Sequence, residues 1–135
     1  MDAGAFLRAR RIVLDTALRR VPLKLQRVLV HELFHFVWWR LGSPRRREWE
    51  ALIVAESSRG EAGWSSEWRK RVLVGTDRRT RSRRWREYLC ESFCDSASVF
   101  YAGTSQDQEI TLAPRWLKIR RRWFEDALGA GPLSI

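Results

Sequence analysis

Two histidines and a glutamate form a short pattern that could hold a metal ion. His31, Glu32 and His35 belong to a segment that reads H-E-x-x-H and has apolar residues on both sides. On a helix, side chains four positions apart lie one turn above each other, with about 5–6 Å between Cβ atoms. Two imidazoles at this spacing can bind one Zn²⁺, while the glutamate can take a proton from a water that the metal activates. The pattern therefore predicts a zinc site with hydrolytic chemistry.

Composition limits the remaining ligands of such a site. The sequence contains two histidines and the motif uses both, so a third protein ligand has to be Asp, Glu or Cys. Zinc enzymes that complete their site with a third histidine are therefore excluded. Candidate ligands lie together in a second segment, residues 85–97, which contains Cys90, Glu91, Cys94 and Asp95.

An H-E-x-x-H motif followed by E-x-x-x-D on a second helix resembles the gluzincin metallopeptidases, which include the thermolysin-like enzymes. The resemblance implies that His31 and His35 are metal ligands, that Glu91 is the third ligand and that Glu32 is the general base. It implies that Asp95 orients a ligand histidine, and metal-bound imidazoles usually do donate their other N–H to a carboxylate or carbonyl. The resemblance covers only these two segments, and the 55 residues between them exceed the compact spacing of thermolysin.

Peptide hydrolysis also needs a donor to the oxyanion that develops in the transition state. The gluzincin family uses a histidine for this, and the sequence has no third histidine. Tyr88 lies one turn before Glu91 on the same side of the predicted helix, so we expect it to take this role. Tyr101 and an arginine are the alternatives.

A rival arrangement uses the same histidines in a closed site. Cys90 and Cys94 are also four residues apart, so with both histidines they could form a His₂Cys₂ structural zinc site. Glu91 and Asp95 lie about 100° away around the helix, so we expect only one of the two sets to face the metal. The carboxylates are favoured, because a closed site leaves acidic side chains without a role in apolar surroundings.

The elements that carry these residues are expected to be mainly α-helical, α+β at most, in a zincin-like domain with two site helices and at most a small N-terminal strand or β-ribbon. The run from Arg10 to Asp15 predicts a short strand, and a helix over 5–20 fits almost as well. Proline, serine and glycine at segment ends, with apolar periodicity between them, predict helices over 22–40, 44–57, 64–74, 82–101 and 115–128. A loop is predicted over 75–84 and a brief strand over 109–112.

Length and composition suit one zincin-like domain, residues 1–135, with 44% hydrophobic residues and eight tryptophans to form a core. No apolar run is long enough for a membrane span, and no secretory signal is present, so a cytoplasmic protein is expected. The net charge of +10 is concentrated in three arginine clusters, at residues 45–47, 78–86 and 120–122. These clusters suit a solvated surface or attraction to nucleic acid or an acidic partner.

The sequence thus predicts a zinc-dependent metallopeptidase acting on a peptide or protein substrate. One alternative is a basic nucleic-acid-associated protein with the closed His₂Cys₂ zinc site. Another is a gluzincin-like protein that is inactive or acts on a single partner protein. In the first alternative, replacing Cys90 or Cys94 releases the metal, whereas in the predicted peptidase replacing Glu91 does so.

Overall fold

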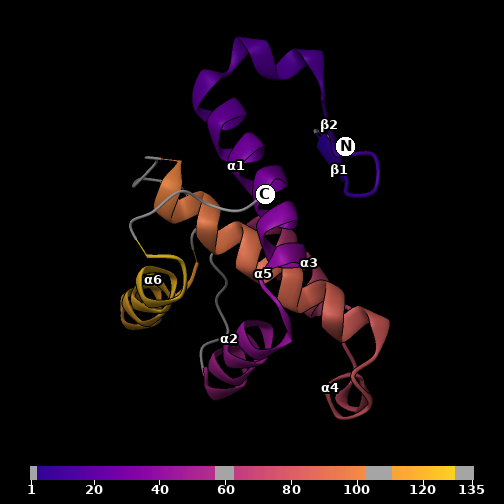
Figure 1. Cartoon of the computed structure of the whole chain (residues 1–135), viewed down its shortest axis with the longest axis vertical. Coiled ribbons are helices and arrows are strands. Elements are labelled where there is room, and N and C mark those ends of the chain that lie inside the picture. Colours follow the sequence, from indigo (N-terminus) through magenta and orange to yellow (C-terminus); the bar gives the residue numbers. More distant parts are fainter. Residues whose placement is uncertain (1–2, 57–62, 103–110, 130–135) are drawn as a thin grey trace.

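The computed structural model describes residues 3–56, 63–102 and 111–129 of the chain (Figure 1). Its elements are β1 (Ala3–Phe6), β2 (Arg11–Leu14), the 3-10 helix η1 (Thr16–Arg20), α1 (Pro22–Arg40), α2 (Ser43–Ala55), α3 (Trp64–Arg71), α4 (Gly75–Thr80), α5 (Arg83–Tyr101) and α6 (Pro114–Leu128). The predicted class, mainly α with a small N-terminal sheet, is confirmed. None of the helices within these ranges is long and apolar enough to cross a membrane.

The N-terminal segment forms an antiparallel hairpin, in which β1 pairs with β2 and Ala5 lies opposite Ile12. The strand predicted to end near Asp15 is thereby confirmed as β2, and the helical alternative over 5–20 is wrong. Asp15 instead starts η1, because its carboxylate accepts a hydrogen bond from the Ala17 N–H at 2.8 Å. The sequence did not predict the position of β1, because its Ala-Gly-Ala-Phe run lacks the β-branched residues typical of strands.

Two other local predictions are corrected. The predicted loop over 75–84 contains the short helix α4, because the Asp77 carboxylate accepts hydrogen bonds from the Val74 N–H and the Ser82 hydroxyl, both at 2.7 Å. These bonds hold the pKa of Asp77 below its ordinary value, and the bond from Val74 has the larger effect. Of the predicted strand over 109–112, residues 109 and 110 lie outside the described residues, and residues 111 and 112 are not in a strand.

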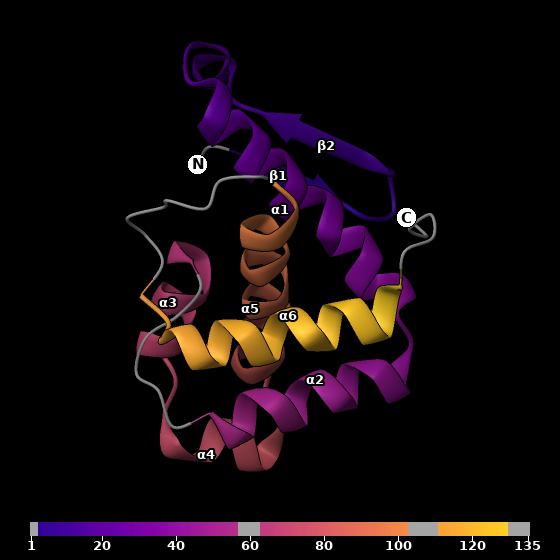
Figure 2. The ribbon, with the colours of Figure 1, turned by 90° about the vertical axis from the view of Figure 1, so that its left-hand side faces the viewer.

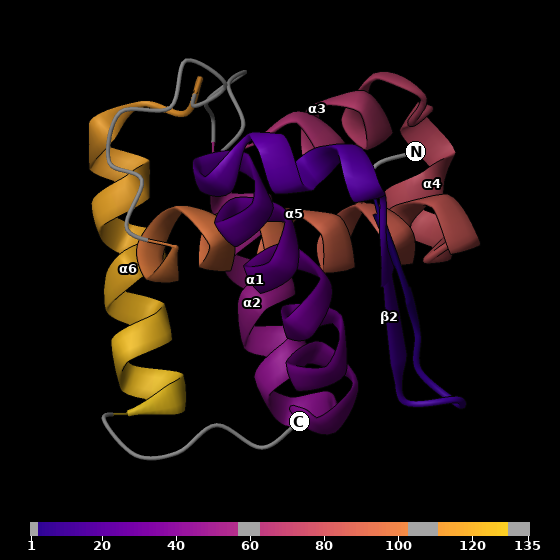
Figure 3. The same cartoon turned by 90° about the horizontal axis from the view of Figure 1, so that it is seen from above.

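Helix α5 is the centre of the fold and contacts each of the other α-helices (Figures 1 and 2). Its most extensive contacts are with α1, which crosses it, and with α3. The β1–β2 hairpin packs against α1, and α6 lies on the other side of α1 from the hairpin (Figure 3). Gly42 separates α1 from α2 with a φ of 83°, a left-handed conformation that glycine adopts without strain.

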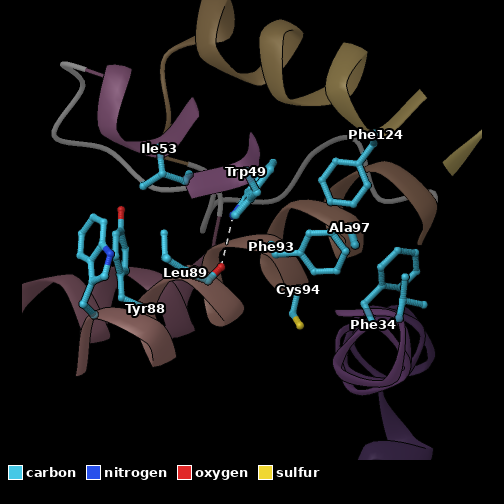
Figure 4. Close-up of a cluster of buried hydrophobic side chains, with 11 residues drawn as sticks. Phe34, Trp49, Ile53, Tyr88, Leu89, Phe93, Cys94, Ala97 and Phe124 are labelled. Carbon is cyan, nitrogen blue, oxygen red and sulfur yellow. Dashed lines mark hydrogen bonds between the residues drawn. The ribbon is translucent and has the colours of Figure 1, made fainter. Parts of the chain in front are cut away.

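The aromatic core joins α5 to α1, α2 and α6 (Figure 4). Phe93 is completely buried and stacks on Phe124 with ring centroids 4.9 Å apart, and Trp49 meets Phe124 edge-on at 5.4 Å. The Trp49 indole N–H lies 3.2 Å from the Leu89 carbonyl and 3.1 Å from the Ser92 hydroxyl. This packing fixes the rotation of α5 about its axis and therefore decides which of its other side chains face α1.

A buried ion pair connects the end of α2 to α5 and α6. Both side chains are almost inaccessible, with Arg120 at 0% exposure and Glu56 at 5%. Arg120 binds the Glu56 carboxylate through two nitrogens, at 2.6 and 2.7 Å, and donates a third bond to the Ser96 hydroxyl at 2.9 Å. A guanidinium that binds a carboxylate through two parallel bonds in this way is fixed in both position and orientation.

We expect Arg120→Ala to lower the free energy of unfolding by about 3–5 kcal/mol, because it leaves the Glu56 carboxylate buried without its partner. Urea denaturation followed by circular dichroism measures the change. Arg122→Ala on the exposed side of the same helix is the matched control, with an expected change within about 0.5 kcal/mol. Equal stability of the two variants would show that the buried pair contributes nothing to folding.

Candidate metal centre

The two histidines of the motif lie on the side of α1 that faces α5. His31 and His35 are one turn apart, with ring centroids separated by 5.1 Å and ring planes at 68°. The Glu91 carboxylate of α5 lies against both rings. One of its oxygens is 3.0 Å from His31 Nε2, and the other is 3.6 Å from His35 Nε2. The structure thus brings the three predicted ligands together.

The donors and separations of the three predicted ligands can be compared with those that zinc requires. Tetrahedral zinc with bonds of about 2.0–2.1 Å to nitrogen and oxygen places its ligand atoms about 3.3–3.4 Å from one another. The distances from Glu91 to the two Nε2 atoms, 3.0 and 3.6 Å, lie on either side of this value and start from different carboxylate oxygens. The donor set of two imidazoles and one carboxylate is also the one that catalytic zinc sites use when they leave a position for water. The predicted residues therefore fit zinc in the chemistry of their donors, whereas the described ligand atoms of His31, His35 and Glu91 do not all lie within 4.8 Å of one another.

Asp95 holds His31 from the other side of its ring. The Asp95 Oδ1 atom is 2.8 Å from His31 Nδ1, which leaves the Nε2 atom of that ring directed at Glu91. Asp95 thus contacts a histidine, as its predicted role requires. A carboxylate in this position selects the tautomer and the orientation of the imidazole.

The first turn of α3 in turn holds Asp95. The Ser66 N–H donates to Asp95 Oδ2 at 2.7 Å, and the Ser66 hydroxyl lies 2.8 Å from the same oxygen. Gly63 comes so close that a Cβ atom there would lie 2.8 Å from Asp95 Cγ. The sequence does not indicate this contact, because nothing in the local pattern links Ser66 to a carboxylate 29 residues later.

We expect Gly63→Ala to weaken zinc binding by about 10- to 100-fold, the usual cost of disturbing a group that orients a metal ligand. The added methyl group has to displace Asp95 and with it the Nδ1 partner of His31. Competition with a chromogenic chelator measures the affinity. Gly75→Ala is the matched control, since a Cβ at that position meets nothing within 4 Å. The same affinity in both variants would contradict a role of Asp95 in metal binding.

The charges in the site favour a cation. Burial alone would lower the pKa of His31, but the hydrogen bonds and charges of Asp95 and Glu91 raise it to about 10. For Glu91, burial acts to raise the pKa, yet the bond to His31 and the neighbouring positive charges hold it below its ordinary value. The site therefore has an ionised acid beside a protonated imidazole, and a metal ion has to replace that proton when it binds.

The two cysteines lie closer to the histidines than the sequence suggested. Cys90 Sγ is 3.4 Å from His35 Nδ1, while Glu91 lies at the Nε2 atom of the same ring, so the two sets of side chains both face α1 but meet different atoms of His35. Positions 90, 91, 94 and 95 occupy an arc of only about 140° on a helix with 100° per residue. One side of α5 can therefore present both the sulfurs and the carboxylates to α1.

The grouping of ligand atoms nevertheless differs from a closed site. Two groups of three have ligand atoms within 4.8 Å of one another, one made of His31, His35 and Cys94 and the other of His31, Glu91 and Asp95. Within the described residues, no such group joins both sulfurs to both rings, and none joins Glu91 to both rings. Burial and the contact with Cys90 raise the pKa of Cys94 well above its ordinary value, which disfavours the thiolate that binds zinc.

Glu32 lies between α1 and the hairpin and is 8% exposed. Burial raises the pKa of its carboxyl group, and the charges of His31 and His35 and a hydrogen bond from the Ala5 backbone oppose the shift. The net pKa is above the ordinary value. A carboxylate with a raised pKa accepts a proton more readily near neutral pH.

The predicted oxyanion donors lie elsewhere. Tyr88 is 3% exposed in the hydrophobic core and packs against Trp85 with ring centroids 5.6 Å apart, and Figure 4 draws it on the side of α5 away from the Cys94 sulfur. Tyr101 stacks on Phe34 at 5.3 Å. An arginine, the third alternative, is nearer, because the charge of Arg69 on α3 contributes to lowering the pKa of Glu91.

Comparisons of the chain with protein-family models, with characterised proteins and with solved structures found no match. The arrangement of His31, His35, Glu91 and Asp95 is therefore the basis on which a function can be argued.

Proposed function

We propose that this protein is a zinc-dependent metallopeptidase in which His31, His35 and Glu91 hold the metal. The observation that carries the proposal is the Glu91 carboxylate, which lies 3.0 and 3.6 Å from the two Nε2 atoms while Asp95 occupies Nδ1 of His31. Bound zinc supplies a Lewis acid that polarises the scissile carbonyl and lowers the pKa of water.

Glu32 is the general base of the proposed reaction. Its carboxylate accepts a proton from the attacking water and delivers it to the nitrogen of the leaving amine. The raised pKa of Glu32 supports both transfers, because the group can hold the proton between them. Asp95 and Ser66 keep the His31 ring oriented throughout, through the bonds at 2.8 and 2.7 Å.

Strand β1 pairs only with β2 among the described residues, and its second edge supports a peptide as the substrate. The Ala5 backbone contributes to lowering the pKa of Glu32, so this strand lies beside the proposed general base. An extended peptide can bind to such an edge by main-chain hydrogen bonds. A peptide bound in this way would have its backbone beside Glu32 without requiring a deep cleft.

The direct test is cleavage of a denatured protein, such as reduced casein, by the full chain loaded with one equivalent of Zn²⁺. New peptides detected by mass spectrometry, and lost when a chelator removes the metal, are the expected result. Zinc bound at one per chain without any cleavage would refute the peptidase and leave a metal-binding protein.

A closed His₂Cys₂ site in a nucleic-acid-associated protein is the second candidate. The contact of 3.4 Å between Cys90 Sγ and His35 Nδ1 favours it. The pKa of Cys90 also supports it, because a hydrogen bond from Cys94 and the neighbouring His35 lower it to about 6 against the effect of burial. The two candidates differ in which side chains the metal needs, so substitutions in α5 separate them.

A further inference from the structure

Two of the arginine clusters in the sequence meet at one pocket outside the metal centre. Arg46 and Arg47 of α2 and Arg81 and Arg86 from the α4–α5 region line a cavity with a volume of about 320 Å³, which we call the arginine pocket. These residues are more than 30 positions apart in the sequence, and only the packing of α2 against α5 brings them together. None of them belongs to the proposed metal centre.

The positive charge of the arginine pocket is largely uncompensated. Arg81 pairs with Glu50 at 3.0 Å, and the Glu50 carboxylate also accepts the Trp85 indole N–H at 2.8 Å. The guanidinium groups of the other three arginines form no ion pair with any described part of the chain. Four arginines and one glutamate therefore leave an excess of positive charge around a small volume, which attracts a compact anion.

The remaining lining of the pocket is apolar or neutral. Trp38 and Leu89 supply a hydrophobic wall, and Ser43 lies in the first turn of α2, where the helix dipole adds positive potential. Trp38 is half-buried and held by packing on Phe93 with ring centroids 5.0 Å apart. An indole and several guanidinium planes favour a ligand with a flat aromatic group, because both stack on such groups.

We propose that the arginine pocket binds a small phosphate-bearing molecule with an aromatic ring, that is, a nucleotide. Guanidinium groups bind phosphate through two parallel hydrogen bonds, and the Trp38 wall receives the base. A volume of about 320 Å³ is that of a small-molecule pocket, at the lower end of the usual range. This favours a single nucleotide over an extended nucleic-acid strand, which needs a continuous groove. The inference does not depend on the proposed peptidase activity.

Isothermal titration of the full chain with adenosine monophosphate tests the proposal. One nucleotide is expected to bind per chain, with inorganic phosphate binding more weakly because it lacks the ring that contacts Trp38. A short single-stranded oligodeoxynucleotide without a terminal phosphate is the third probe. Failure of adenosine monophosphate to bind, or a clear preference for the oligonucleotide, would overturn the proposal.

Two double variants separate a built site from general charge attraction. Arg47→Ala with Arg86→Ala removes two exposed arginines of the pocket and is expected to weaken nucleotide binding by about 100-fold, about tenfold for each charge-assisted contact. Arg19→Ala with Arg20→Ala removes the same charge from η1 and is expected to leave binding unchanged. Equal losses in both double variants would show attraction to net charge alone and would refute the pocket.

A third variant probes the geometry of the contact. Arg47→Lys with Arg86→Lys keeps the charge of the pocket but removes the two-pronged guanidinium. Nucleotide affinity is expected to fall between that of the original chain and that of the double alanine variant. Full affinity with lysine would contradict paired hydrogen bonding to phosphate and would overturn this part of the proposal.

Discussion

Glu32→Gln is expected to lower the rate of peptide cleavage by about 10²- to 10⁴-fold, the usual contribution of a general base, while zinc still binds at one per chain. Glutamine has almost the same shape as glutamate but cannot accept the proton of the attacking water. His31, His35 and Glu91 are untouched, so the metal-binding residues stay intact. The measurement pairs a cleavage rate on a denatured protein with metal analysis of the same sample.

The matched control for this variant is Glu48→Gln. Glu48 lies on α2 with its side chain 48% exposed and forms only an exposed ion pair with Arg45 among the described residues. Its replacement removes the same charge and is expected to leave both the cleavage rate and the zinc content unchanged. Cleavage at the original rate by Glu32→Gln would refute the base assignment, even if the protein proved to be a peptidase.

Glu91→Ala is expected to weaken zinc binding by more than about 100-fold, because a lost ligand costs more than the 10- to 100-fold typical of the groups that orient ligands. The variant removes the carboxylate that lies against both Nε2 atoms. It also leaves Asp95 as the one carboxylate paired with His31 in the described part of the chain. Chelator competition measures the affinity, and circular dichroism shows whether the metal-free variant is folded.

Cys94→Ala and Cys90→Ala are the matched controls on the same helix. With Glu91 as the third ligand, both cysteine variants are expected to bind zinc almost as tightly as the original chain. The closed His₂Cys₂ site predicts the reverse, with metal lost from the cysteine variants and retained by Glu91→Ala. The experiment therefore has two opposite outcomes, and the second would end the peptidase proposal.

The sequence alone determined the features that depend on local geometry. The i, i+4 spacing of His31 and His35 places both rings on one side of any helix, whatever surrounds it. Pro22 and Gly42 bounded α1 correctly, since proline suits a first helical turn and Gly42 takes a positive φ after the last. The pairing of Glu91 and Asp95 on a second helix could likewise be predicted from their spacing.

Only the tertiary structure decided which side chains of α5 face α1, because the rotation of a helix depends on what packs behind it. Here Phe93 and the buried Trp49 hold one side of α5 in the core. That rotation brings Glu91 against both rings, and it also brings Cys90 to His35. From their spacing alone, the carboxylates and the cysteines are alternative sets of ligands.

The groups that join distant segments were also beyond the reach of the sequence. Ser66 and Gly63 hold Asp95, and Glu56 meets Arg120, across loops whose paths no local pattern specifies. The arginine pocket exists for the same reason, since its two clusters come together only when α2 packs on α5. Spacing along one helix is set by backbone hydrogen bonds, whereas contacts between helices are set by the packing of the whole core.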